Sequence, residues 1–138
     1  MELYHASKQI VQYPEVRKAK YTKDFSWGFY CTNNIQQAIR WVNRGAGDPV
    51  INYYEYEPND SLKILKFPEM SDEWLDLIAQ CRNGKTHNYD IVEGPMADDT
   101  VWNYVNDFLT GRISRKQFWI NLFLSSDIQR WLRGLKYC

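Results

Sequence analysis

The chain has 138 residues, enough for a hydrophobic core of its own, and we expect a single domain over residues 1–138. Its 17 Lys and Arg residues balance 17 Asp and Glu residues, which disfavours non-specific binding to nucleic acid because such binding needs a basic surface. Aromatic side chains make up 16% of the chain, a proportion that suits both a core and a ligand cleft.

The sequence contains no pattern for a metal site, a disulfide framework or a membrane span. The three cysteines lack C-x-x-C spacing, and neither histidine accompanies them in a ligand pattern. No run approaches about 18 consecutive apolar residues, and the N-terminus lacks the features of a signal peptide. We therefore expect a cytoplasmic, metal-free protein with no membrane partner.

The first part of the chain predicts short strands around one helix, from runs of β-forming residues and apolar positions at helical spacing. The expected elements are a strand at 3–5, a turn at Pro14, a basic loop at 17–23, a strand at 29–31, a helix from Thr32 or Asn33 to Asn43, and a strand at 50–56.

The rest of the chain predicts two further strands and several helices, whose starts are marked by capping residues. These elements are a strand at 61–67 paired with 50–56, a helix from Ser71 to Cys81, a strand at 89–93, a helix from Asp98 or Asp99 to Leu109, and a helix from Ser114 with Gln117 at its capping-box position. Strands and helices follow no regular alternation and several strand pairs look antiparallel, which favours an α+β fold.

Common catalytic signatures are absent. The sequence has no G-x-G-x-x-G, no P-loop, no G-x-S-x-G and no H-E-x-x-H. Taken alone, His5 and Tyr30 are more often structural residues than functional ones. Their significance depends on the motifs around them.

Five motifs occur in a characteristic order: LYHAS at 3–7, DFSWGFYCT at 24–32, QAIRW at 37–41, WLD at 74–76 and HNYDIVEGPMADD at 87–99. Together they closely resemble DUF3990, a bacterial family of uncharacterised domains that looks like a branch of the ADP-ribosyltransferase-like superfamily. The resemblance extends from Leu3 to about Trp119.

The resemblance implies a split, mostly antiparallel β core flanked by helices, with a cleft that binds NAD in a bent conformation. It implies transfer of ADP-ribose from NAD to an unknown acceptor, with release of nicotinamide. By motif, His5 would hydrogen-bond the ribose next to the nicotinamide, as a donor, and Tyr30 would stack on the nicotinamide ring. Phe29 would then face the core, and Trp27 would lie at the rim of the cleft. The neighbouring residues expected to bind NAD are Ala6, Ser7, Gly28, Phe29 and Thr32.

A third site residue, Glu or Gln, is expected near the end of such a domain, and Gln129 is the candidate by position. Two interpretations stay open, because Ser126 and Gln129 also form a capping box in a stretch with helical apolar spacing. The Thr-containing strand usual in the family is not recognisable here. Two further departures are Ala6 and Ser26, at positions where the family usually has Gly.

Two functions follow from the resemblance. The first is an active ADP-ribosyltransferase with NAD as co-substrate, in which an oxocarbenium-like state forms as the nicotinamide–ribose bond breaks. The second is a degenerate member that binds NAD, a nucleotide or a protein without turnover. A toxin-type role in bacterial or phage conflict is a weaker suggestion of the same resemblance.

Overall fold

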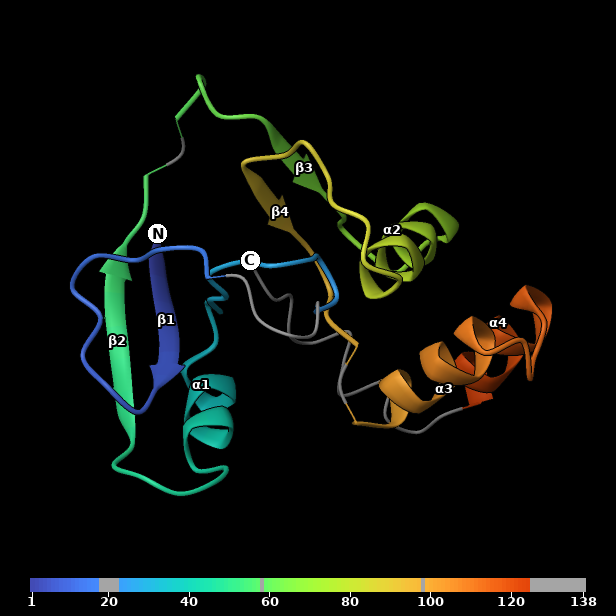
Figure 1. The fold of residues 1–138 in the computed structure, drawn as a ribbon, viewed down its shortest axis with the longest axis horizontal. Coiled ribbons are helices and arrows are strands. Elements are labelled where there is room, and N and C mark those ends of the chain that lie inside the picture. The colour runs from blue at the N-terminus through green and yellow to red at the C-terminus, as the bar shows by residue number, and fades with distance from the viewer. Residues whose placement is uncertain (18–22, 58, 98, 125–138) are drawn as a thin grey trace.

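The computed structural model describes residues 1–17, 23–57, 59–97 and 99–124. These residues form a small α+β fold with four helices and two two-stranded sheets. The elements lie in two groups (Figure 1), one around β1 and β2 and the other around β3 and β4.

The first group contains β1 (Glu2–Ser7), α1 (Ile35–Val42) and β2 (Val50–Glu55). β1 and β2 pair antiparallel, with His5 opposite Asn52. The buried Asn52 amide donates to the carbonyl of Gln9, and its Oδ1 accepts from the Val11 amide at 2.8 Å. Asn52 therefore holds the chain that leaves β1 against the sheet.

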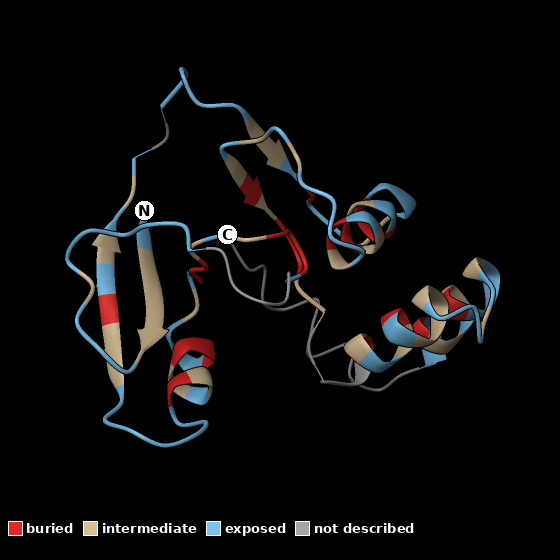
Figure 2. Cartoon of the chain, in the orientation of Figure 1, coloured by how far each residue is buried: buried red, intermediate tan, exposed pale blue. Residues whose placement is uncertain are grey.

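The second group contains β3 (Ile64–Lys66), α2 (Asp72–Arg82), β4 (Ile91–Glu93), α3 (Asp99–Leu109) and α4 (Arg115–Leu124). β3 and β4 are parallel and are connected through α2, because parallel neighbours need a crossover. Buried side chains concentrate in this group (Figure 2). The core residues contributed by its helices are Trp74, Leu75, Ile78, Val101, Val105, Phe118 and Leu122.

Several predicted helix boundaries are confirmed. Ser71 caps α2, with its Oγ accepting from the Trp74 amide at 3.2 Å, and Ser114 Oγ accepts from the Gln117 amide at 3.1 Å. The predicted cap of α1 is wrong, because Asn34 and not Thr32 or Asn33 accepts from the first amides of that helix. Gln129, the predicted third site residue, lies outside the described residues.

The predicted pairing of residues 50–56 with 61–67 is also wrong. β2 pairs with β1, and β3 pairs with β4. The connection between β2 and β3 is too long for a tight hairpin, and it carries the chain from one group of elements to the other (Figure 1). The predicted strand at 29–31 does not form either, and the residue that follows it, Thr32, makes an isolated bridge with Tyr4.

Candidate functional site

Residues 24–32, the central segment, join the two groups of elements. At one end the buried Asp24 carboxylate accepts from Arg82 Nε at 3.0 Å and from the Ala97 amide at 2.7 Å. At the other end Thr32 and Tyr4 exchange two backbone hydrogen bonds of 2.8 and 2.9 Å. The segment is therefore held by α2 on one side and by β1 on the other.

His87 supports the central segment from the second group. Its Nδ1 accepts from the Tyr89 amide at 3.2 Å, so the ring proton is on Nε2, which donates to the Phe25 carbonyl at 2.9 Å. Both ring nitrogens are thus used within the protein. This histidine has a structural role and offers no nitrogen to a ligand.

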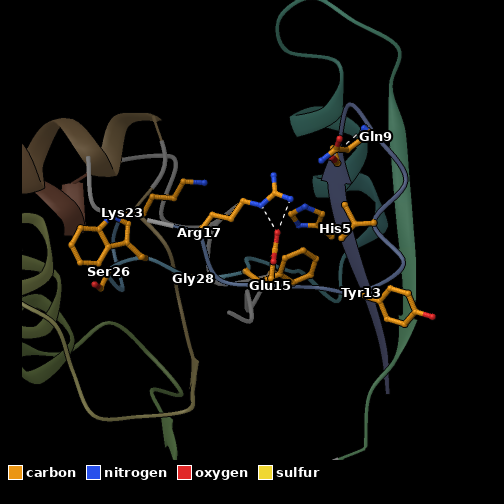
Figure 3. Close-up of a pocket in the computed structure, with 12 residues that line it drawn as sticks. His5, Gln9, Tyr13, Glu15, Arg17, Lys23, Ser26 and Gly28 are labelled. Carbon is orange, nitrogen blue, oxygen red and sulfur yellow. Dashed lines mark hydrogen bonds and ion pairs between the residues drawn. The ribbon is translucent and has the colours of Figure 1, made fainter. Parts of the chain in front are cut away.

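Two cavities lie on either side of the central segment and share Trp27, Gly28 and Phe29 as a common wall. We call the first the polar cavity; its volume is about 260 Å³, and charged or polar side chains surround it (Figure 3). We call the second the aromatic cavity; its volume is about 300 Å³. The prediction that Trp27 borders a cleft agrees with this geometry.

His5 projects from β1 into the lining of the polar cavity. Its Nδ1 lies 2.7 Å from the Tyr30 carbonyl oxygen, and since a carbonyl only accepts, Nδ1 carries the proton. Phe29 stacks on the imidazole with ring centroids 4.0 Å apart and packs edge-on against Tyr54 at 5.8 Å. The imidazole is therefore fixed in one orientation and one tautomer.

The electrostatics of the polar cavity keep His5 neutral. Burial lowers the pKa of His5 below its ordinary value of 6.5, the bond to the Tyr30 carbonyl partly offsets this effect, and the charge of Lys23 lowers the pKa further. Nε2 of the neutral ring is an acceptor. This differs from the expected role of His5, in which the side chain is a hydrogen-bond donor.

Tyr30 does not occupy the position expected of a stacking platform. Its side chain is 7% exposed, and its hydroxyl donates to the Ser26 carbonyl at 2.6 Å and accepts from the Phe25 amide at 3.1 Å. Lys23 Nζ lies 5.0 Å from the ring centroid. Through these two hydrogen bonds the Tyr30 hydroxyl stabilises the turn at 25–30. Tyr30 also contributes to the lining of the aromatic cavity.

The predicted orientations of Phe29 and Tyr30 are the reverse of those observed. Phe29 is partly buried and contacts His5 at the polar cavity, whereas Tyr30 belongs to the core cluster. The prediction assumed a strand, in which successive side chains alternate between two faces. Because residues 29–31 form no strand, that alternation does not apply.

The family comparison covers nearly the whole chain, including all five motifs and the linings of both cavities. Residues 1–131 match the family described as "Protein of unknown function (DUF3990)". The chain belongs to the DUF3990 family. No curated protein and no solved structure matches it. In this DUF3990 protein, no helix of the described residues is long and apolar enough to cross a membrane.

The remaining residues predicted for this DUF3990 protein divide between the polar cavity and the interior. Ser7 and Gly28 line the polar cavity, whereas Ala6 lies on β1 opposite Ile51 and lines neither cavity. Thr32 is buried, with its Oγ1 donating to Gln37 Oε1 at 2.6 Å. Thr32 thus positions the central segment and contacts neither cavity.

Three charged residues of the polar cavity were missed from the sequence: Glu15, Arg17 and Lys23. Arg17 Nε donates to Glu15 Oε1 at 2.6 Å, and both side chains are exposed. The signal for these residues that the sequence offered was the basic composition of 17–23. That Arg17 and Lys23 lie near His5 could not be inferred, because this proximity depends on where the central segment crosses the molecule.

Proposed function

We propose that this DUF3990 protein is a NAD-dependent ADP-ribosyltransferase that transfers ADP-ribose to an acceptor and releases nicotinamide. The observation that carries the proposal is His5, held as a neutral ring with its protonated nitrogen already bonded, in a cavity that also contains Arg17 and Lys23. An acceptor nitrogen beside two cationic side chains suits a ribose hydroxyl next to a diphosphate. We also propose that the two small sheets are the two parts of a split ADP-ribosyltransferase-like core.

The reaction assigned to the polar cavity is heterolytic. The bond between the nicotinamide nitrogen and the ribose C1′ breaks, and nicotinamide leaves with the bonding pair as a neutral molecule. A nucleophilic atom of the acceptor then forms a bond to C1′ and loses its proton. Positive charge develops on the ribose in between, and a carboxylate in the cavity stabilises it.

Glu15 is the carboxylate that we assign to this role. It lines the same cavity as His5 and is paired with Arg17 (Figure 3). If the diphosphate of NAD were to pair with Arg17, the Glu15 carboxylate would become available to the ribose. Glu15 would then take the role of the third site residue, for which Gln129 was the candidate by sequence.

A cavity of about 260 Å³ encloses one end of a dinucleotide rather than all of it. The ribose adjacent to the nicotinamide and the diphosphate belong in this space. The adenosine would extend along the surface.

The test measures nicotinamide release and transfer of label from NAD carrying a labelled adenosine, in the presence of a cell lysate. We expect the wild type to release nicotinamide and Glu15→Gln to do so about 100-fold more slowly, because it lacks the stabilising charge. Glu15 is exposed, so this variant should fold normally. Glu69→Gln, an exposed carboxylate outside both cavities, is the matched control and should keep full activity.

One observation favours a second function, that of a binding module without turnover. Tyr30, expected to stack on the nicotinamide, is buried and fully engaged through its hydroxyl. The two functions separate in the same experiment when NAD binding is measured by calorimetry. Binding without nicotinamide release assigns an NAD-binding module, and the absence of both rejects the transferase and the NAD-binding module together.

A further inference from the structure

β2 has a neighbouring strand on one side only, because its sheet contains β1 and β2 alone among the described residues. Thr32 lies on the far side of β1, where its amide and its carbonyl form hydrogen bonds of 2.9 and 2.8 Å with Tyr4. Since both backbone groups of Tyr4 are used there, they point away from β2. Tyr4 and Tyr53, which lie opposite each other, are therefore a non-hydrogen-bonded pair of the β1–β2 ladder.

This pairing determines which backbone groups of β2 face outward. Opposite residues alternate between hydrogen-bonded and non-hydrogen-bonded pairs, so the N–H and C=O groups of Ile51, Tyr53 and Glu55 point away from β1. The Tyr56 amide donates to the Met1 carbonyl at 2.7 Å, as the same alternation requires. No group in the described part of the chain pairs with the outward backbone of these three residues. The outer edge of β2 thus has the row of donors and acceptors that an added strand uses.

Edge strands in natural proteins are usually protected against such pairing by lysine, proline or a β-bulge. β2 has none of these: its sequence is VINYYE, and its register with β1 is continuous. The loop at residues 8–17 passes on the outer side of β2 (Figure 1), but it is attached through the side chains of Asn52 and Tyr54. The backbone groups of the edge therefore keep their capacity to bind.

The surroundings of this edge are acidic. Residues 45–62 contain no Lys or Arg, and their carboxylates are those of Asp48, Glu55, Glu57 and Asp60. Glu2, opposite Glu55 on β1, forms no ion pair within the described residues, whereas Glu55 pairs with the N-terminal ammonium at 3.2 Å. The Tyr53 hydroxyl lies 3.0 Å from an oxygen of each of these two carboxylates, and its single proton can serve only one of them. A cationic side chain beside Glu55 and Tyr53 would balance this charge.

We propose that the outer edge of β2 binds an extended, basic segment of a partner protein as an added antiparallel strand. Alternate residues of that segment exchange backbone hydrogen bonds with Ile51, Tyr53 and Glu55, and their side chains lie on the same face of the sheet as those three. A Lys or Arg opposite Glu55 supplies the balancing charge, and an aromatic or β-branched residue packs beside Tyr53, which is 54% exposed.

A second copy of this chain fits the edge less well, because its own β2 segment brings further carboxylates and no cation. The edge residues Ile51, Tyr53 and Glu55 line neither cavity. The proposed binding is therefore independent of the proposed reaction.

The test is calorimetric titration with a blocked peptide of sequence TKTYTVT, whose Lys would lie opposite Glu55, Tyr opposite Tyr53 and Val opposite Ile51. N-methylation of the peptide Tyr removes an N–H that points at the edge, whereas N-methylation of the Thr after it alters an N–H that points to solvent. We expect the first change to weaken binding at least about tenfold and the second to change it less than about twofold. Glu in place of the peptide Lys should also weaken binding, by a factor that shrinks as salt is added.

Tyr53→Pro tests the same hydrogen bonds from the side of the protein. It removes an N–H that the β1–β2 ladder does not use, a position at which an edge strand tolerates proline, and peptide binding should be lost. Tyr53→Val is the matched control, because it also lacks the tyrosine ring but keeps the N–H, and it should still bind the peptide.

Hydrogen exchange of the wild type gives a readout that needs no variant. Without peptide, the amides of Ile51, Tyr53 and Glu55 should exchange faster than those of Asn52 and Tyr54, and the peptide should slow the first set alone. Equal protection of both sets, equal weakening by the two N-methyl groups, or full binding by Tyr53→Pro would overturn the proposal. A dimer in analytical ultracentrifugation that Tyr53→Pro dissociates would overturn it in favour of self-association at this edge. None of these measurements involves NAD, so a failure of the proposed reaction does not affect them.

Discussion

The two cavities share one wall and are similar in volume, but they differ in the side chains that line them. The polar cavity has a neutral imidazole, a carboxylate and two cations around it, whereas the lining of the aromatic cavity includes the rings of Trp27, Tyr30, Tyr56 and Tyr89. Charged groups at a surface suit a sugar and phosphates, and a ring-lined cavity suits a flat base. The shared wall therefore separates two linings of different chemical character.

The shared wall depends on the absence of a side chain at Gly28. A Cβ at this position would lie 3.2 Å from Tyr30 Cε2, closer than almost all such contacts. A side chain there would push the Tyr30 ring or fill cavity space. Glycine at position 28 thus leaves room for the Tyr30 ring beside the wall that the two cavities share.

The largest expected effect comes from detaching the central segment, which forms the shared wall, from α2. Asp24→Asn should lower the free energy of unfolding by about 3 kcal/mol, because it leaves the partly buried Arg82 without its anion. Arg82 also lies over the Trp102 ring, 4.1 Å from its centroid, so it cannot move to solvent without losing that contact. Urea denaturation measures the change, and the NAD binding proposed for the polar cavity should weaken with it.

The matched control is Asp76→Asn. Asp76 pairs with Arg115 at 2.6 Å, but both side chains are well exposed, so this loss should be below about 1 kcal/mol. Similar losses for the two variants would mean that the Asp24 pair is no stronger than a surface pair. The central segment would then need another explanation for its position.

A pH titration tests the environment of His5 in the polar cavity. Because the pKa of His5 is lowered in the folded protein, the unfolded chain binds more protons between that lowered value and about 6.5. The free energy of unfolding should therefore fall as pH drops through this window and be unaffected by His5 above it. We expect a smaller effect than that of Asp24→Asn.

The measurement is urea denaturation at several pH values for the wild type and His5→Gln. The carboxylates titrate alike in both proteins, so the difference between the two curves isolates His5. The difference should change between pH 7 and 5 and be constant above pH 7. Parallel curves over the whole range would show that burial does not disfavour the protonated ring.

Much of the local structure could be predicted from sequence, because it depends on neighbours along the chain. Ser71 begins α2 through a hydrogen bond to a residue three positions on, and the strands near residues 3–5 and 50–56 follow from their composition. Strand partners were not predictable in this way. The parallel pairing of β3 with β4 depends on how α2 packs, which no local pattern encodes.

The candidate site could be predicted in part for the same reason. The resemblance placed His5 and residues 27–29 in one region, where the structure has the two cavities. It did not give the His5 tautomer, which depends on a carbonyl 25 residues away. Nor did it indicate Glu15, which lies outside the motifs that carry the resemblance but lines the polar cavity.

The smallest predicted effect concerns the turn that brings the central segment between the cavities. Ser26, where the family usually has Gly, has a φ of 73° and is the one non-glycine residue with positive φ in the described part of the chain. This conformation costs an L-residue about 1–2 kcal/mol. Glycine avoids this cost but loses more entropy on folding, so a change to glycine recovers only part of the energy. Ser26→Gly should therefore raise the free energy of unfolding by about 0.5–1 kcal/mol, measured by urea denaturation.

The control is Gly45→Ala, at a φ of 79° with nothing within 4 Å of the added Cβ. It tests the backbone cost alone and should lower the free energy of unfolding by about 1 kcal/mol. If Ser26→Gly is destabilising while Gly45→Ala behaves as expected, the Ser26 side chain itself holds the wall of the polar cavity, and the departure from the family motif is a local adaptation of that wall rather than a tolerated strain.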